Sequence, residues 1–369
     1  MFTLDRSKND TSIGLDLLRA TAAQLVCVGH AISFFVSDWR PSGFALIQNV
    51  GVLLFFLISG FLITHTLIRK SADPDYGFFQ FCIERFARIY TGLIPALLFV
   101  AIVDFVAIYF TSDPTIARYY TLKTFVANLF MLEGYQGVFA GRLRWPAFGS
   151  ASPLWTLGIE WHIYIFVGAL FFMVQRSRSI LLLAPIALLF GQTPVFYLFG
   201  SFQPDGVGFA LFTLWIMGAL VYFADVIPVG KLYAGASIGV VAIVAFVAET
   251  QAGAEYNLVS YILLAAAFFG LIATTQSMHV VTSKTAIKLI SFLADYSFSL
   301  YLVHHTLMYA MWTMFSSRGA AMFAIAVVAS NLVAIGLAQI GEKHHRLFAR
   351  LLTRMLGLHA KQSKMATSR

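Results

Sequence analysis

The chain has 369 residues, of which 59% are hydrophobic and only 11% are charged. A soluble domain of this size carries about twice that charged fraction, so the composition excludes a soluble globular protein and predicts a polytopic membrane protein. The net charge of +8 is typical of basic loops and a basic tail on one side of a membrane, and we expect no nucleic-acid partner.

Apolar stretches near the roughly 20 residues that a bilayer requires predict about ten transmembrane helices. They cover approximately residues 13–36, 44–68, 92–110, 153–175, 180–199, 207–226, 232–249, 256–275, 293–315 and 320–340. With the N-terminus inside, 18 of the 25 Lys and Arg residues fall on the inner side, so we expect both termini in the cytoplasm. The sequence therefore predicts an all-α transmembrane domain over residues 1–345 and a basic cytoplasmic tail over residues 346–369.

The first span carries ionisable side chains. Arg19 and His30 are 11 residues apart, which places both on one helix face, about 16 Å apart along the axis. Ionisable groups inside a membrane are costly unless a polar cavity or a partner receives them, so the pair marks a candidate functional site. The alternative is an arginine that extends to the lipid headgroups and a structural histidine. Asp16 is a candidate cavity-lining residue in the same stretch.

The second span and the stretch after it give a packing seam and a surface helix. Ser59 and Gly60 are small residues that allow close helix approach, and Ser59 is also a candidate cavity-lining residue. The aromatic and basic stretch Phe78–Tyr90 predicts a helix that lies on the cytoplasmic surface.

Basic residues gather at this same surface: Arg69, Lys70, Arg85 and Arg88. Arg85 and Arg88 are spaced i, i+3 and share a helix face. Together with Arg19 they would form a cationic entrance for phosphate groups. The alternative is that membrane topology alone requires basic residues here.

The longest outer segment covers residues 111–152. Within it, the stretch Thr121–Leu132 is apolar with polar interruptions and predicts an interfacial helix. The sequence GRLRWPAFGSASP, residues 141–153, predicts an ordered loop over the outer mouth of the bundle.

A second candidate site follows at the outer end of the fourth span. Glu160 lies about seven residues, or roughly 10 Å, below the predicted outer surface, and His30 lies at a similar depth in the first span. A carboxylate beside an imidazole orients it and raises its basicity, so Glu160 and His30 are the candidate catalytic pair. The alternative is a packing contact. Trp155 and Tyr164 are candidate cavity-lining residues.

The ninth span brings further polar groups into the membrane, among them Asp295, Ser297, Ser299, His304 and His305. The two histidines point to different helix faces, so we expect at most one of them, His304, to face the same cavity as His30. No stretch has the residue spacing of a metal site, and we expect no metal ion.

Five stretches, in this order, resemble the acyltransferase-3 family of membrane O-acyltransferases that modify bacterial surface polysaccharides. They are GLDLLRATAAQLVCVGH (14–30), GVLLFFLISGFLIT (51–64), FFQFCIERFARIYTGLIP (78–95), SPLWTLGIEWHIYIF (152–166) and DYSFSLYLVHH (295–305). Ile163 stands where the family usually has an aromatic residue, Phe298 and Ser299 alter the ninth-span pattern, and Pro95 comes later than in many members. None of these departures removes a charged group.

The resemblance implies a bacterial inner-membrane enzyme with acetyl-CoA as donor and a hydroxyl of a surface glycan or lipid-linked saccharide as acceptor. It implies that Arg19, Arg85 and Arg88 bind the phosphates of CoA, and that His30, oriented by Glu160, is the general base or carries the acyl group transiently. The other partner is membrane lipid. The competing hypothesis is a transporter or flippase for a lipid-linked glycan, which would use the same polar cavity without acyl chemistry.

Overall fold

The computed structural model describes residues 4, 9–39, 45–175, 179–224, 232–251, 255–276, 281 and 283–357. The described residues are mostly α-helical, and they contain no β-strand beyond a single isolated bridge between Glu133 and Trp145. Of the predicted basic tail, residues 358–369 lie outside the described residues. The all-α prediction is confirmed for the part of the chain that is described.

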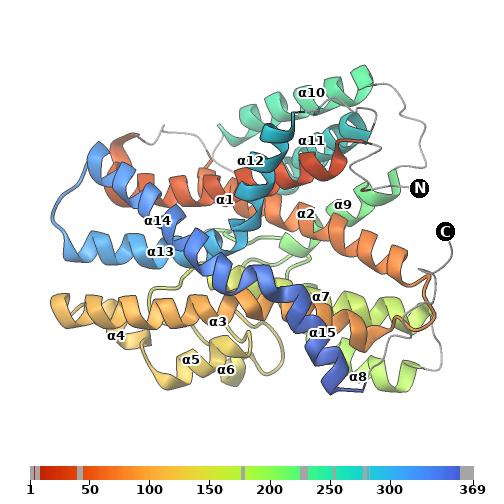
Figure 1. Ribbon diagram of the computed structural model, residues 1–369, viewed down its shortest axis with the longest axis horizontal. Helices are drawn as coiled ribbons and strands as arrows, with labels where there is room; N and C mark the ends of the chain where they lie inside the picture. Colours follow the sequence, from red (N-terminus) through yellow and green to blue (C-terminus); the bar gives the residue numbers. More distant parts are fainter. Residues whose placement is uncertain are drawn as a thin grey trace.

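The helices pack side by side in one bundle (Figure 1). The longer ones are α1 (Thr11–Phe35), α2 (Ile47–Lys70), α3 (Phe78–Thr111), α7 (Leu154–Gln175), α8 (Ile180–Phe196), α9 (Leu211–Phe223), α10 (Leu232–Thr250), α11 (Leu258–Gln276), α12 (Lys284–Asp295), α13 (Ser297–Met314), α14 (Ala320–Ile340) and α15 (His345–Met355). Three short helices follow α3, namely α4 (Pro114–Tyr119), α5 (Leu122–Leu129) and α6 (Ala140–Leu143), and the 3-10 helices η1 (Ser37–Trp39) and η4 (Glu342–His344) follow α1 and α14.

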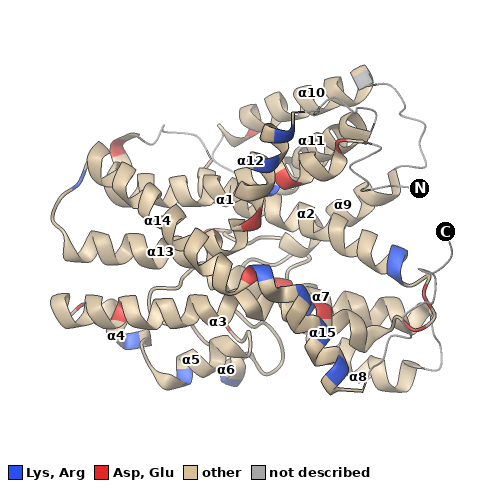
Figure 2. Ribbon diagram, in the orientation of Figure 1, with Lys and Arg blue, Asp and Glu red and all other residues tan. Residues whose placement is uncertain are grey.

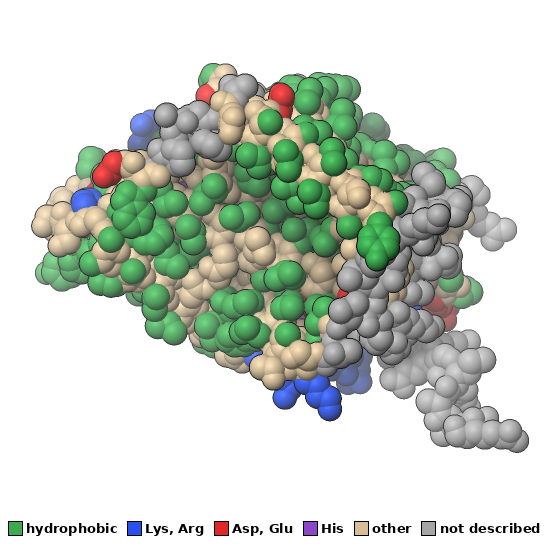
Figure 3. All heavy atoms as spheres, turned by 90° about the horizontal axis from the view of Figure 1, so that it is seen from above, with side chains coloured by type: hydrophobic (Ala, Val, Ile, Leu, Met, Phe, Trp, Pro, Cys, Tyr) green, Lys and Arg blue, Asp and Glu red, His purple; other side chains and the backbone are tan. Residues whose placement is uncertain are grey.

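Within the described residues, seven helices are long and apolar enough to cross a membrane, and the bent pair α12–α13 would be an eighth span. The predicted fifth and sixth spans correspond to α8 and α9, which are apolar but shorter. Large apolar side chains are exposed on α3, for example Ile102 at 66% and Tyr109 at 75%. Hydrophobic side chains also cover much of the face in Figure 3. Such exposure suits lipid contact, so the chain is a multi-pass membrane protein.

Helix α3 is longer than the sequence predicts. It runs through 34 residues without interruption, about 51 Å, and it includes the stretch that we predicted to be a separate surface helix, Phe78–Tyr90. That prediction is wrong because the helical hydrogen bonding continues across the boundary. Pro95 within α3 leaves the carbonyl of Thr91 without its helical donor, and Gly341 packs so closely on Thr91 that a Cβ there would collide with it.

We call the end of the bundle where α1 and α3 begin the proximal end, and the end where they finish the distal end. Helix α1 is central, because it contacts α2, α11, α12, α13 and α14. The predicted seam at Ser59 and Gly60 is confirmed: Gly60 lies against the backbone of Trp215 in α9, with no room for a side chain.

The segment between α3 and α7, residues 112–153, does not stay at the distal end; we call it the fold-back segment. Tyr120 donates to the carbonyl of Ala101 (2.9 Å), and Tyr90 donates to the carbonyl of Leu129 (2.6 Å). Tyr90 lies 21 residues before Thr111, so the segment returns about 31 Å along α3.

This return corrects both predictions for the segment. The predicted interfacial helix Thr121–Leu132 is a shorter helix, α5, whose end lies beside the proximal half of α3 rather than at the distal surface. The predicted outer loop, residues 141–153, ends with Ser150 and Ala151 buried in the bundle. As a result, α7 begins inside the bundle and not at its distal surface.

Candidate functional site

The three arginines predicted to bind phosphate line one cavity of about 160 Å³. It lies between α1, α2, α3, α7 and α13, and we call it the arginine cavity. Its polar lining consists of Arg19, Ser59, Arg85, Arg88, Thr156, Glu160, Tyr164, Ser297 and Tyr301. The apolar lining comes mainly from α2, where Phe55, Phe56 and Leu62 face it. The cavity is thus a cationic chamber with one apolar wall.

The cavity arginines differ in their partners. Arg19 pairs with Asp16 (3.2 Å) one turn away on α1, and Arg88 pairs with Glu342 (2.8 Å) in η4. Arg85 has no carboxylate at ion-pair distance among the described residues, and its buried Nε has no hydrogen-bond acceptor there. Figure 2 shows several acidic and basic residues where α15 lies on α3, and others spread over the remaining helices. Arg85 therefore offers the least compensated positive charge of the three.

Glu160 belongs to this cavity and ends a chain of hydrogen bonds. Trp215 Nε1 donates to Ser59 Oγ (3.1 Å), and Ser59 Oγ lies 3.0 Å from Tyr164 Oη. Tyr164 Oη donates to a carboxylate oxygen of Glu160. Since Tyr164 gives its only hydroxyl proton to Glu160, Ser59 must be the donor to Tyr164, and Ser59 accepts from the indole. The chain fixes the carboxylate in a cavity that also holds Arg85 and Arg88.

The structure does not bring Glu160 to His30. The hydrogen bonds of the His30 ring go to Val26 and His304, and Glu160 is bonded to Tyr164. Glu160 lines the same cavity as Arg19, which lies about 16 Å from His30 along α1. The equal-depth prediction fails because α7 begins inside the bundle, which carries Glu160 toward the proximal end.

His30 instead lies in a cluster with His304 and His305, which we call the histidine cluster. The ring centroids of His304 and His305 lie 5.0 and 5.2 Å from that of His30. We expected at most one of them beside His30. That expectation is wrong because side chains about 100° apart on α13 can flank a ring that lies between them.

Backbone carbonyls determine the protonation of these rings. His304 Nδ1 lies 2.9 Å from the Leu300 carbonyl and must donate to it, so Nε2 of the neutral ring accepts from His30 Nδ1 at 3.1 Å. His30 Nδ1 is also 3.0 Å from the Val26 carbonyl. The proton of His30 is therefore on Nδ1, and its Nε2 keeps a free lone pair, as a general base requires.

His305 is held from the fold-back segment. Its Nδ1 donates to the carbonyl of Ser150 (2.7 Å). Ser150 is in turn fixed by Asp104 of α3, which accepts from the Ser150 amide (2.8 Å) and hydroxyl (2.6 Å). Asp104 is completely buried, and a Cβ at Gly149 would collide with its carboxylate. The sequence analysis missed Asp104, although a lone carboxylate in an apolar span was a signal for it.

Tyr301 connects the two sites. It lines the arginine cavity, and its ring centroid is 6.1 Å from that of His304. Its hydroxyl bonds the hydroxyl of Thr156 (2.5 Å) and the carbonyl of Pro153 (3.0 Å). The Tyr301 ring on α13 thus lies between the arginine cavity and His304, and its hydroxyl is fixed by residues at the start of α7.

The other predicted site residues lie nearby but not in the cavity. Trp155 stacks on Phe202, with ring centroids 5.0 Å apart, Asp16 pairs with Arg19, and His304 contacts His30. Within the described parts of the chain, no group of His, Cys, Asp and Glu is arranged to hold a metal ion.

Comparison with protein-family models gives a match that covers most of the chain. A protein-family model described as an acyltransferase domain, acyltransferase-3, matches residues 12–339. The chain belongs to the acyltransferase-3 family. The match includes every residue of the histidine cluster and the three cavity arginines, and it ends just before Glu342.

Relatives of this family member align over parts of their length. An O-acetyl transferase of Shigella phage Sf6 is 25% identical over 178 residues, 46% of this chain and 48% of the relative. A putative peptidoglycan O-acetyltransferase of Bacillus subtilis is 30% identical over 190 residues, 48% of this chain and 26% of that protein. A peptidoglycan O-acetyltransferase of Listeria monocytogenes is 31% identical over 156 residues, 41% and 22% of the two chains. Each alignment spans about half of the relative or less, and no solved structure matches the chain.

Proposed function

We propose that this protein transfers an acetyl group from acetyl-CoA to a hydroxyl of a cell-surface or lipid-linked polysaccharide, in the inner membrane of a bacterium. The observation that carries the proposal is that Tyr301 both lines the arginine cavity and lies beside His304, whose Nε2 bonds His30 Nδ1 and so leaves His30 Nε2 unprotonated. The names of the relatives support acetyl transfer to a glycan. Both termini and the proximal end would face the cytoplasm, where the donor is made.

The arginine cavity would hold the donor. Guanidinium groups bind phosphate through paired hydrogen bonds, and Arg85 has no competing carboxylate at ion-pair distance among the described residues. The apolar wall from α2 would accept the pantetheine arm, which would extend past Tyr301 toward the histidine cluster. Glu160 would position Tyr164 and balance the charge of the arginines, rather than orient His30.

His30 would be the general base. Its Nε2 would remove the proton of the acceptor hydroxyl while that oxygen attacks the thioester carbonyl. The carbon–sulfur bond then breaks, and the proton passes from His30 to the leaving thiolate to give free CoA. During the step His30 carries a positive charge, and the carbonyl of Val26 and Nε2 of His304 would stabilise it by accepting from Nδ1–H.

The test uses the purified protein in nanodiscs with acetyl-CoA labelled in the acetyl group. Release of CoA and labelling of a crude glycan extract would be followed for wild type and His30→Ala. Glycan-dependent release that the substitution abolishes would support the proposal. Folded wild-type protein that neither binds nor turns over acetyl-CoA would contradict it and favour a transporter or flippase for a lipid-linked glycan.

A further inference from the structure

A buried carboxylate lies beside the arginine cavity. It comes from the segment after α14, which contributes no residue to the cavity lining. Glu342 follows α14 in η4 and is only 2% exposed. Neighbouring residues Lys343 and His344 are exposed. The Glu342 side chain therefore points away from the surface that its neighbours face.

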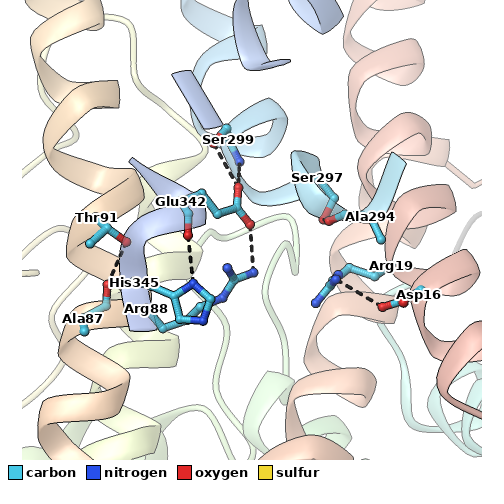
Figure 4. A network of polar contacts seen from close by, with 10 residues as sticks. All are labelled: Asp16, Arg19, Ala87, Arg88, Thr91, Ala294, Ser297, Ser299, Glu342 and His345. Carbon is cyan, nitrogen blue, oxygen red and sulfur yellow. Dashed lines mark hydrogen bonds and ion pairs between the residues drawn. The ribbon is translucent and has the colours of Figure 1, made fainter. Parts of the chain in front are cut away.

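The carboxylate joins two walls of the cavity (Figure 4). One oxygen lies 2.8 Å from a guanidinium nitrogen of Arg88 on α3. The other accepts from the amide (3.2 Å) and the hydroxyl (3.0 Å) of Ser299 in the first turn of α13. The amides of a helix's first turn have no acceptor within the helix, so Glu342 caps α13 and fixes Arg88 with the same group.

The position of this cap is important because α12 and α13 meet there at a bend of 52°. Ser297 and Phe298, just after the bend, line the arginine cavity, and the guanidinium of Arg88 lies over the ring of Phe298 at 5.7 Å. Figure 4 shows the side chains of Arg88 and Arg19 pointing toward one another. Their charges repel, and Glu342 opposes that repulsion.

A carboxylate on a phosphate-binding arginine has two opposite explanations. It either fixes the arginine for the phosphate or occupies the place of the phosphate and must leave. Departure would break the bonds to Arg88 and Ser299 and would separate Gly341 from Thr91 and Phe348 from Phe86, with which they pack. The buried and multiply bonded position favours the first explanation.

We propose that Glu342 is a positioning residue of the donor site, which fixes Arg88 and the first turn of α13 so that both can receive a phosphate group of acetyl-CoA. This inference rests on the proposed function for the identity of the ligand. It makes the segment after α14 part of the site.

The experiment is a double-mutant cycle on the full-length protein in nanodiscs, with acetyl-CoA binding and steady-state kinetics as readouts. The variants are Glu342→Gln, Arg88→Gln and the two combined. The matched control is Glu84→Gln, because Glu84 forms an ion pair with Lys70 (2.7 Å) outside the cavity. Ser299→Ala is a milder second variant, since it removes one donor and leaves every charge in place.

We expect Glu342→Gln to weaken acetyl-CoA binding about tenfold and to raise KM with kcat unchanged. In the Arg88→Gln background it should have a clearly smaller further effect, which comes only from the contact with Ser299, and Glu84→Gln should behave as wild type. Ser299→Ala should weaken binding by a smaller factor. If Glu342→Gln does not fold, Ser299→Ala provides the test: weaker acetyl-CoA binding would support the inference, and unchanged binding would overturn it.

Three outcomes would overturn the inference: unchanged or tighter binding by Glu342→Gln, additive effects with Arg88→Gln, or a fall in kcat at constant KM. Tighter binding would show that Glu342 competes with the phosphate. If wild type binds acetyl-CoA and these outcomes appear, the positioning role alone fails. If folded wild type does not bind acetyl-CoA, the proposed function fails with it.

Discussion

The arginine cavity and the histidine cluster share helices α1 and α13, but their polar side chains differ in kind. The cavity contains charges, and two of its arginines have carboxylate partners. The cluster contains imidazoles, and each of the three donates its Nδ1 proton to a backbone carbonyl. No carboxylate bonds a ring of the cluster among the described residues.

With the proposed function, this difference would assign donor binding to the cavity and proton transfer to the cluster. A charged cavity attracts an anionic donor and depends on side chains that can adjust to it. A cluster of neutral rings fixed by backbone carbonyls keeps its bases unprotonated and its geometry rigid, as proton transfer requires. We therefore expect changes in the cavity to act on donor affinity, and changes in the cluster to act on turnover.

The largest effect should follow His30→Ala. Loss of a general base lowers the rate by about 10²- to 10⁴-fold, and acetyl-CoA affinity should stay within error because the cavity is intact. The control is His162→Gln, since His162 is also buried on a helix and bonded to a carbonyl, that of Gly158, but lies outside both sites. Comparable loss of turnover in both variants would remove the special role of His30.

The next effect concerns Arg85, the cavity arginine without a carboxylate partner. Arg85→Gln should weaken acetyl-CoA binding about 10- to 100-fold, measured by titration at several salt concentrations, with kcat nearly unchanged at saturating donor. Arg69→Gln, a change at the end of α2 outside the cavity, should have little effect. An Arg85→Gln variant that loses kcat but keeps its affinity would contradict the division between the two sites.

The same division shows which features the sequence could predict. The sequence could predict that Arg19, Arg85 and Arg88 share one cavity, because same-face and i, i+3 spacings within a helix are local properties. The pairing of Glu160 with His30 was wrong because it required the depth at which α7 begins, and that depth depends on a segment that folds back along α3. Glu342 gave no signal, since a carboxylate beside Lys343 and two histidines is typical of an ordinary basic tail.

Asp104 tests whether the fold-back segment supports the cluster. Asp104→Asn cannot accept both hydrogen bonds from Ser150, so the carbonyl that orients His305 should shift. We expect kcat to fall about tenfold with donor affinity unchanged, and Asp104→Leu to be more severe. Asp205→Asn, at an exposed loop carboxylate, is the control. A loss of donor affinity with kcat intact would show that Asp104 supports the cavity instead.

The smallest effect concerns the pH dependence of the protein's stability, through Glu133 of the fold-back segment. Glu133 is 1% exposed, lies against Gly158 of α7, and neither of its carboxylate oxygens has a hydrogen-bond partner among the described residues. Burial raises the pKa of Glu133 well above its usual range. The folded protein therefore keeps the proton at pH values where the unfolded chain has lost it, so this group's contribution to stability falls as pH rises above the unfolded value of about 4.3.

Glu133→Gln cannot ionise and should lack this dependence. Between about pH 5 and 8, the unfolding temperature of wild type should fall relative to that of the variant by a few degrees, as measured by thermal unfolding in detergent. Asp205→Asn should follow wild type at each pH. Parallel curves for wild type and Glu133→Gln would show that Glu133 is ionised in the folded protein.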